Sequence, residues 1–143
     1  MDNQLIAALN EALNRELATF IRYLIQGSLI QGLTNEPLRA MYRRELSDEM
    51  GHAQYLADKI VTLGGSPTAN PDLTPPPLNI SEMIQNDLDA EKSDVAHYTK
   101  LARMADEVGD LELKLRMEEQ AADETRHAQE LQRMQSLDAP NLS

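Results

Sequence analysis

The feature of this sequence that most restricts its fold is an internal repeat. The stretch 48–56, DEMGHAQYL, returns at 123–131 as DETRHAQEL. The offset is 75 residues, and it relates four pairs: Glu16 and Glu91, Tyr23 and Tyr98, Glu49 and Glu124, and His52 and His127. The repeat therefore predicts two copies of one structural unit within the chain.

Each copy has the pattern of a helical hairpin. Apolar residues recur at spacings of three and four, which is the period of an amphipathic helix, and Gly or Pro residues separate the runs. The predicted helices cover about 3–31, 35–63, 80–108 and 110–137. The segment 64–79 carries five of the seven prolines and cannot be helical. The chain is therefore predicted to be all-α.

Several polar residues are candidates for the caps of these helices. Thr34 or Asn35 precedes the second helix, and Asp110 precedes the fourth. Asn79 precedes the third helix and is followed at the right distance by Glu82, which is the pattern of a capping box. These signals place the three helix starts independently of the apolar pattern.

The length of the segment 64–79 distinguishes between two bundle topologies. A helix of about 28 residues is roughly 40 Å long. An extended segment of about 16 residues spans up to roughly 50 Å, enough to return along the whole bundle. We therefore expect one domain over residues 1–143, a four-helix bundle of two antiparallel hairpins joined by one long crossover, with no fifth helix after Leu137.

Ionisable residues lie within the predicted apolar stripes. The first stripe includes Leu5, Leu9, Leu13, Glu16, Leu17, Phe20, Tyr23 and Leu24, and the third includes Leu88, Glu91, Val95 and Tyr98. Each lone Glu, at 16 or 91, lies 33 residues before the Glu of a Glu-x-x-His motif, with a turn near the midpoint. Each hairpin should therefore bring its lone Glu level with its motif. Six residues are predicted to face one core: Glu16, Glu49, His52, Glu91, Glu124 and His127.

Four buried carboxylates would repel one another strongly or take up protons, so such a cluster needs cations. Two divalent ions would balance four carboxylates while both imidazoles stay neutral. One Glu-x-x-His motif on a charged helix is more often solvated than ligating, but two copies matched to two core Glu residues favour a di-metal site. Oxygen and nitrogen donors suit iron or manganese, and zinc is chemically compatible.

The composition excludes several other functions. Asp and Glu number 24 against 13 Lys and Arg, so the chain should repel nucleic acid and anionic membrane surfaces. It has no Cys, which excludes disulfides and thiolate chemistry and fits a reducing compartment. The sequence shows neither a signal peptide nor a membrane span, so a cytoplasmic location is expected.

The sequence resembles the bacterioferritins over about residues 3–137. The resemblance rests on NREL with Tyr23 following, on DEMGHAQYL, on LNI before the third helix, and on DETRHAQEL. It implies that Glu16 and His52 hold one iron, that Glu91 and His127 hold the other, and that Glu49 and Glu124 bridge them. Tyr23 would be a hydrogen-bonding or redox-active phenol beside the site, and the alternative is a buried core Tyr with a satisfied hydroxyl.

The resemblance also implies a haem b between two subunits, with Met50 as its axial ligand. The alternative for Met50 is an apolar residue in a dimer interface, and its counterpart in the repeat is Thr125. Arg44 stands where the family tends to have a His, which argues against an accessory iron site beside Asp48. The short sequence after the fourth helix leaves open whether the homo-oligomer is a dimer or a larger shell.

The function implied is that of a ferroxidase, which oxidises ferrous iron with oxygen or hydrogen peroxide at a di-iron site for iron storage and detoxification. Two other functions stay open. One is a di-iron or di-manganese peroxidase or catalase of the same fold without mineral storage. The other is a haem-binding or structural dimer. No role for nucleic acid or membrane is expected in any of them.

Overall fold

The chain folds into the four-helix architecture that its periodicity predicts. A computed structural model describes residues 3–135, and its helices are α1 (Asn3–Leu29), the 3-10 helix η1 (Leu33–Asn35), α2 (Glu36–Thr62), α3 (Ile80–Glu107) and α4 (Leu111–Gln135). No strand occurs in this part of the chain. The predicted end of the fourth helix at Leu137 and the predicted absence of a fifth helix lie outside the described residues.

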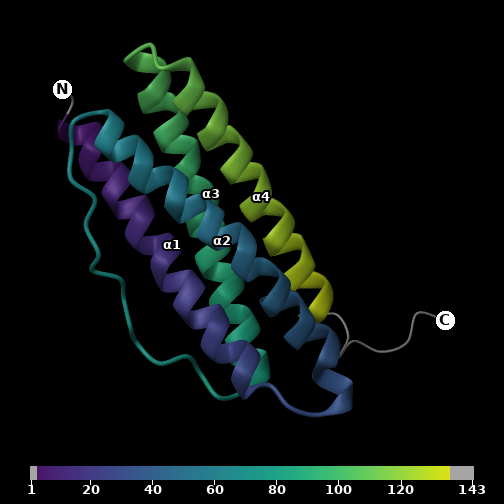
Figure 1. Cartoon of the computed structure of the whole chain (residues 1–143). Helices are drawn as coiled ribbons and strands as arrows, with labels where there is room; N and C mark the ends of the chain where they lie inside the picture. Colours follow the sequence, from purple (N-terminus) through teal and green to yellow (C-terminus); the bar gives the residue numbers. More distant parts are fainter. Residues whose placement is uncertain (1–2, 136–143) are drawn as a thin grey trace.

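Figure 1 shows the predicted topology of two antiparallel hairpins. α1 packs against α2 and α3 packs against α4, while α1 also contacts α3. The segment between α2 and α3 runs along the outside of α1 from one end of the bundle to the other (Figure 1). The long crossover is thus confirmed. None of the described helices is long and apolar enough to cross a membrane.

Two of the three predicted helix caps are present. Asn79 Oδ1 accepts from the backbone N–H of Glu82 at 3.0 Å, and Asp110 Oδ1 accepts from that of Leu113 at 3.0 Å. At the second helix Asn35 holds the N-cap position as predicted, but its side chain makes no cap hydrogen bond and donates to the Gln31 carbonyl instead. The positive φ of Gly32, 94°, lets the chain turn tightly into η1.

The core has two apolar clusters with a polar layer between them. One cluster gathers residues from the N-terminal half of α1, such as Leu9, and the C-terminal half of α2, such as Leu56. The other contains Tyr42, Met83 and Leu131 from the opposite half of the bundle. The repeated Glu and His residues lie between these two clusters. Apolar packing therefore separates them from the solvent at both ends of the bundle.

The predicted core stripe of α1 is correct at its start and wrong at its end. Leu5, Leu9 and Leu13 are buried, but Leu24 is 45% exposed and Phe20 is only partly buried. Steps of four residues advance about 40° beyond a full helical turn, so a run of Leu at that spacing leaves the core. Tyr23 takes the inner position instead. On α3, Asp94 is buried and the predicted Val95 is only partly so.

Two asparagines on α1 hold the crossover against the bundle. Asn10 Oδ1 accepts from the backbone N–H of Thr68 at 2.8 Å, and Asn10 Nδ2 donates to the Ser66 carbonyl at 3.1 Å. Asn14 donates to Thr68 Oγ1 at 2.8 Å and accepts from the backbone N–H of Asn70 at 2.5 Å. An extended segment without its own ladder of hydrogen bonds thus finds partners on a helix.

Candidate metal centre

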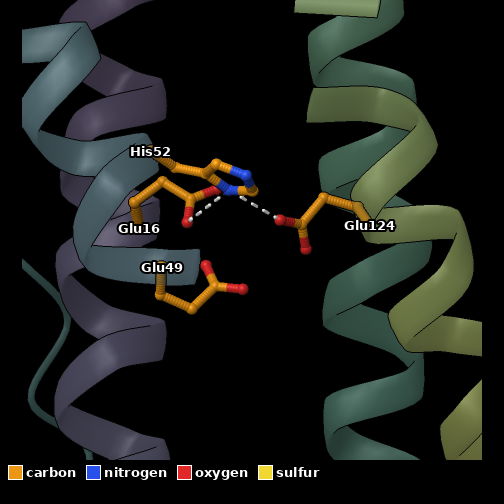
Figure 2. Close-up of side chains that lie close together, drawn as sticks. All are labelled: Glu16, Glu49, His52 and Glu124. Carbon is orange, nitrogen blue, oxygen red and sulfur yellow. Dashed lines mark ion pairs between the residues drawn. The ribbon is translucent and has the colours of Figure 1, made fainter. Parts of the chain in front are cut away.

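All four helices contribute to the cluster of repeated residues in the middle of the bundle. α1 supplies Glu16, α2 supplies Glu49 and His52, α3 supplies Glu91, and α4 supplies Glu124 and His127. The four carboxylates are at most 1% exposed, and the two imidazoles at most 7%. Figure 2 shows Glu16, Glu49 and His52 pointing across the bundle toward Glu124.

The six residues form two overlapping groups. Glu16, Glu49, His52 and Glu124 make one group, and Glu49, Glu91, Glu124 and His127 make the other, with the ligand atoms of each within 4.8 Å of one another. Glu49 and Glu124 belong to both groups. The structure therefore brings together the six residues in the arrangement that the sequence predicted; their roles as metal ligands remain a prediction.

The atoms that lack hydrogen-bond partners have the pattern of a donor set. Eight such buried atoms lie in the cluster: both carboxylate oxygens of Glu49 and of Glu124, Oε2 of Glu16 and of Glu91, and Nδ1 of His52 and of His127. Buried polar atoms are normally hydrogen-bonded, so eight without a hydrogen-bond partner that converge on one small volume call for cations. Four donors per ion would be available for two ions if Glu49 and Glu124 bridge them.

Two tyrosines fix the outer carboxylates in a crossed arrangement. The Tyr23 hydroxyl donates to Glu91 Oε1, and the Tyr98 hydroxyl donates to Glu16 Oε1. Both rings are about 1% exposed. Each hydroxyl occupies one oxygen of a lone Glu and leaves the other oxygen facing the cluster. The bond made by Tyr23 fits both a phenol that acts beside the site and a buried core Tyr with a satisfied hydroxyl, and its repeat partner Tyr98 makes the equivalent bond.

The outer nitrogen of each His faces an acid of the opposite hairpin. His52 Nε2 lies 3.0 Å from Asp123 Oδ2, and His127 Nε2 contacts Glu45 and lies 3.4 Å from Asp48 Oδ2. A carboxylate on one ring nitrogen keeps the proton there and turns the other nitrogen toward a metal. His52 Nδ1 lies 3.2 Å from Glu124 Oε1, and His127 Nδ1 lies 3.3 Å from Glu49 Oε1.

In the absence of cations, the crowded carboxylates of the cluster shift one another's pKa values. Burial raises the pKa of Glu49 well above its usual value, and nearby Glu16 raises it further. Burial, together with a contact from Glu124, likewise raises the pKa of Glu91. Burial opposes the charged form of Glu124 as well, but contacts with Glu91, His127 and His52 hold its pKa below its usual range.

Both imidazoles are strong proton acceptors in this metal-free arrangement. Burial lowers the pKa of His52, but its contacts with Glu124 and Glu16 outweigh burial and raise it to about 9. Burial also lowers the pKa of His127, but its contacts with Glu124 and Glu45 outweigh burial and raise it to about 11. Protons thus stand in for part of the positive charge that the carboxylates attract.

Two buried acids near the cluster were not predicted from the sequence. Asp87 is fully buried and Asp94 is 4% exposed, and they pair with Arg22 and Arg15 of α1 at 2.6 Å and 2.7 Å. Their sequence signal is the spacing 87, 91, 94, 98, which places both on the helical line of Glu91 and Tyr98. Their partners were not predictable, because they lie 65 and 79 residues away.

The remaining candidates lie outside the cluster. Met50 is 55% exposed on α2, on the outside of the bundle, since it directly follows the buried Glu49 on the helix. Arg44 pairs with Glu130 at 3.7 Å. His97 Nε2 lies 3.1 Å from the Ala8 carbonyl, on the α1 side of α3 and outside both groups of clustered residues.

The comparison with known families and proteins agrees with this geometry. A family model described as "Ferritin-like domain" matches residues 6–139. A bacterioferritin from Brucella melitensis is 30% identical over 128 residues, which cover 87% of this chain and 78% of that protein.

Solved structures with the same fold cover nearly the whole chain. A ferritin-like diiron-carboxylate protein from Bacillus anthracis is 35% identical, with a TM-score of 0.90 over 94% of this chain and 99% of that one. A bacterioferritin from Rhodobacter capsulatus, described with a metal-free dinuclear site and a haem iron, is 28% identical, with a TM-score of 0.83 over 96% of this chain and 86% of that one.

Proposed function

This chain belongs to the ferritin-like family, as a relative of bacterioferritin, and on that premise we propose that it is an iron-binding ferroxidase. The observation that carries the proposal is the set of eight buried donor atoms in the bundle core that have no hydrogen-bond partner. Such a set suits two hard divalent cations better than any purely structural role, because an apolar core would avoid the cost of burying these groups.

The side chains would divide the work of binding. Glu16 and His52 would hold one ferrous ion, Glu91 and His127 would hold the other, and Glu49 and Glu124 would bridge them. Tyr98 and Tyr23 would position the outer carboxylates through Oε1, leaving Oε2 of each as a donor. Asp123 and the pair Glu45 and Asp48 would orient the two imidazoles.

Anionic oxygen donors favour the oxidation of the bound substrate. Four carboxylates balance two ferrous ions and stabilise two ferric ions more strongly, since Coulomb attraction grows with the charge of the cation. Two ferrous ions supply two electrons. With two protons, these electrons reduce oxygen to hydrogen peroxide or hydrogen peroxide to two waters, and the ferric product leaves for storage. Manganese or zinc would compete for the same donors.

Three further features belong to the same proposal. Met50 would bind a haem b between two subunits, and its exposed position on α2 is compatible with that role. The chain would act as a homo-oligomer of at least two copies. The proposed location is the cytoplasm, where a reducing environment maintains ferrous iron.

A titration with ferrous iron tests the metal site. Metal-free protein should bind two ferrous ions per chain without oxygen and oxidise them rapidly when oxygen is admitted. Glu124→Ala should lose most of this binding and rapid oxidation, because Glu124 belongs to both groups of ligands. Glu119→Ala, at an exposed position on the same helix, is the matched control. An undiminished rate in Glu124→Ala would refute the assignment of the site.

The closest competing function is a peroxidase of the same fold, and the buried tyrosines beside the cluster favour it over other rivals. Retention of iron distinguishes the two. A storage protein given excess ferrous iron in air keeps iron well beyond two ions per chain through gel filtration. A protein that retains only two ions per chain but consumes peroxide is a peroxidase.

A further inference from the structure

One hydrogen-bond network beside the cluster exists in only one half of the repeat. Asp87 accepts from Tyr42 Oη at 2.6 Å, from Gln26 Nε2 at 2.7 Å and from Arg22 Nε at 2.6 Å. Shifted by 75 residues, the four members correspond to Ala12, Met117, Leu101 and His97. Ala12, Met117 and Leu101 are buried in an apolar cluster. The fold therefore does not require a polar network at this place.

The network adjoins the metal site through a pair of aromatic rings. The rings of Tyr42 and Tyr23 lie edge to face, with centroids 4.8 Å apart and an interplanar angle of 60°. The Tyr23 hydroxyl in turn donates to Glu91. Electron tunnelling falls off exponentially with distance, so two rings in contact exchange an electron readily. Tyr42 is thus one ring further from the cluster than Tyr23, and it is fully buried.

Asp87 gives Tyr42 a place to leave its proton. Burial raises the pKa of Tyr42, and the nearby charge of Asp87 raises it further. Burial and the nearby charge of Glu91 likewise raise the pKa of Tyr23, so both hydroxyls carry their protons at rest. A phenol that loses an electron becomes a strong acid and needs a base within hydrogen-bond reach. Tyr42 has one at 2.6 Å, and Arg22 connects that base to a cavity of about 410 Å³ beneath the crossover.

We propose that Tyr42 is a second redox-active tyrosine, which passes an electron through Tyr23 to the metal cluster while its phenolic proton moves to Asp87. This inference rests on the proposed function. The step applies when hydrogen peroxide meets a chain with a single ferrous ion. That ion supplies one electron and Tyr42 the other, two protons come from solvent, and the peroxide is reduced to two waters. The proton of Tyr23 moves along its hydrogen bond to Glu91 and returns, leaving a neutral radical on Tyr42.

The other half of the repeat offers no such route. Tyr98 donates to Glu16 as Tyr23 does to Glu91. The aromatic ring that neighbours Tyr98, however, is the imidazole of His52, which belongs to the cluster, with ring centroids 6.4 Å apart. The repeat position of Tyr42 holds Met117. An electron can therefore reach the cluster through Tyr23, and the tyrosine on the Tyr98 side is a positioning residue for Glu16.

Electron paramagnetic resonance on rapidly frozen samples tests the relay. Metal-free protein receives about one ferrous ion per chain without oxygen and is then mixed with hydrogen peroxide. Wild-type protein should give a persistent tyrosyl radical. Tyr42→Phe should lose the persistent signal and leave only a short-lived one from Tyr23. Asp87→Asn should also lose it, although both tyrosines are present, because the proton acceptor is gone.

The controls separate loss of the relay from loss of the protein. Tyr55→Phe removes a tyrosine that bonds to Glu112 outside the network and should leave the radical unchanged. Melting of each metal-free variant checks folding, and Asp87 keeps Arg22 and Gln26 as partners in Tyr42→Phe. A persistent radical in Tyr42→Phe, or ferric product without any radical in wild type, would overturn the relay alone. Absence of ferric product in wild type would overturn the proposed function as well.

Discussion

Glu49 illustrates why single residues in this core behave differently with and without cations. Its carboxylate is fully buried, lies near Glu16 and Glu124, and has no hydrogen-bond partner on either oxygen. Without cations, ionised Glu49 raises the free energy of the folded state through desolvation and repulsion. With cations bound, the same two oxygens become donors. One side chain therefore destabilises one state and stabilises the other.

We expect Glu49→Gln to change the stability of the two states in opposite directions. The neutral amide should raise the free energy of unfolding of the metal-free protein by about 1–3 kcal/mol, since the folded state then requires neither a buried charge nor the uptake of a proton at this position. It should also remove most of the stabilisation that added cobalt(II), a redox-stable stand-in for ferrous iron, gives to wild type. Thermal melts with and without cobalt measure both effects. A fall in the metal-free melting temperature would contradict this account, and Glu119→Gln is the exposed control.

The two imidazoles predict the pH dependence of the metal-free protein. Their folded pKa values, about 9 for His52 and about 11 for His127, lie above the unfolded value of 6.5. Their protonation therefore stabilises the fold fully below pH 6.5, and this contribution is lost as the pH rises through 9 and 11. The melting temperature should fall by roughly 10–20 °C from pH 7 to 10. The metal-loaded protein, whose imidazoles are neutral, and metal-free His52→Gln should show a smaller fall.

At the residue scale, the sequence predicted the six clustered side chains because they repeat at a constant offset and fall on apolar stripes. Asp87 and Asp94 were missed because an isolated Asp among charged residues resembles a solvated helix face. Their burial depends on Arg22 and Arg15, which reach them from another helix. Contacts between distant helices are a property of the packed bundle, and no spacing within one helix specifies them.

At the scale of elements, the local capping signals succeeded at the starts of α3 and α4. Asn79 and Asp110 both accept from a backbone N–H three residues on, as their patterns predicted. At α2 the predicted Asn35 holds the N-cap position, but the short connection after Gly32 winds into a 3-10 turn and its side chain bonds to the preceding turn instead of capping. In this 3-10 turn the Asn35 amide lies within reach of the Gln31 carbonyl, four residues earlier, and that bond takes the place of a side-chain cap.

The crossover depends on Asn14, so we expect Asn14→Ala to loosen it. The variant loses the contacts to Thr68 and to the backbone of Asn70, at a cost of about 1–2 kcal/mol. Limited proteolysis should cut the segment 64–79 faster while the helical circular dichroism is unchanged. Glu11→Ala, an exposed change one turn earlier on α1, should leave the cutting rate as in wild type. Equal rates in both variants would show that the asparagine contacts do not hold the segment.

At the scale of the whole molecule, the pseudo-symmetry of the two hairpins separates shared features from individual ones. The Glu and His residues and the crossed tyrosines recur in both halves, as a site for two equivalent ions requires. The Asp87 network and Met50 occur once. A feature that occurs in one hairpin and is absent from the equivalent position of the other is not required by the fold. Such features are therefore the strongest candidates for functions beyond metal binding.

The same comparison provides a matched test of assembly. The first hairpin exposes large apolar side chains, with Leu24 at 45% and Met50 at 55%, whereas the exposed mate of Met50 is Thr125. If copies associate through the first hairpin, Met50→Glu places two like charges in the interface and should shift the mass in sedimentation toward the single chain. Thr125→Glu adds the same charge at the equivalent place on α4 and should not change the mass.

Because the net charge of −11 already opposes association, one further buried charge should be enough to shift the equilibrium. Dissociation by both variants alike would point to general repulsion, and dissociation by Thr125→Glu alone would place the interface on the second hairpin.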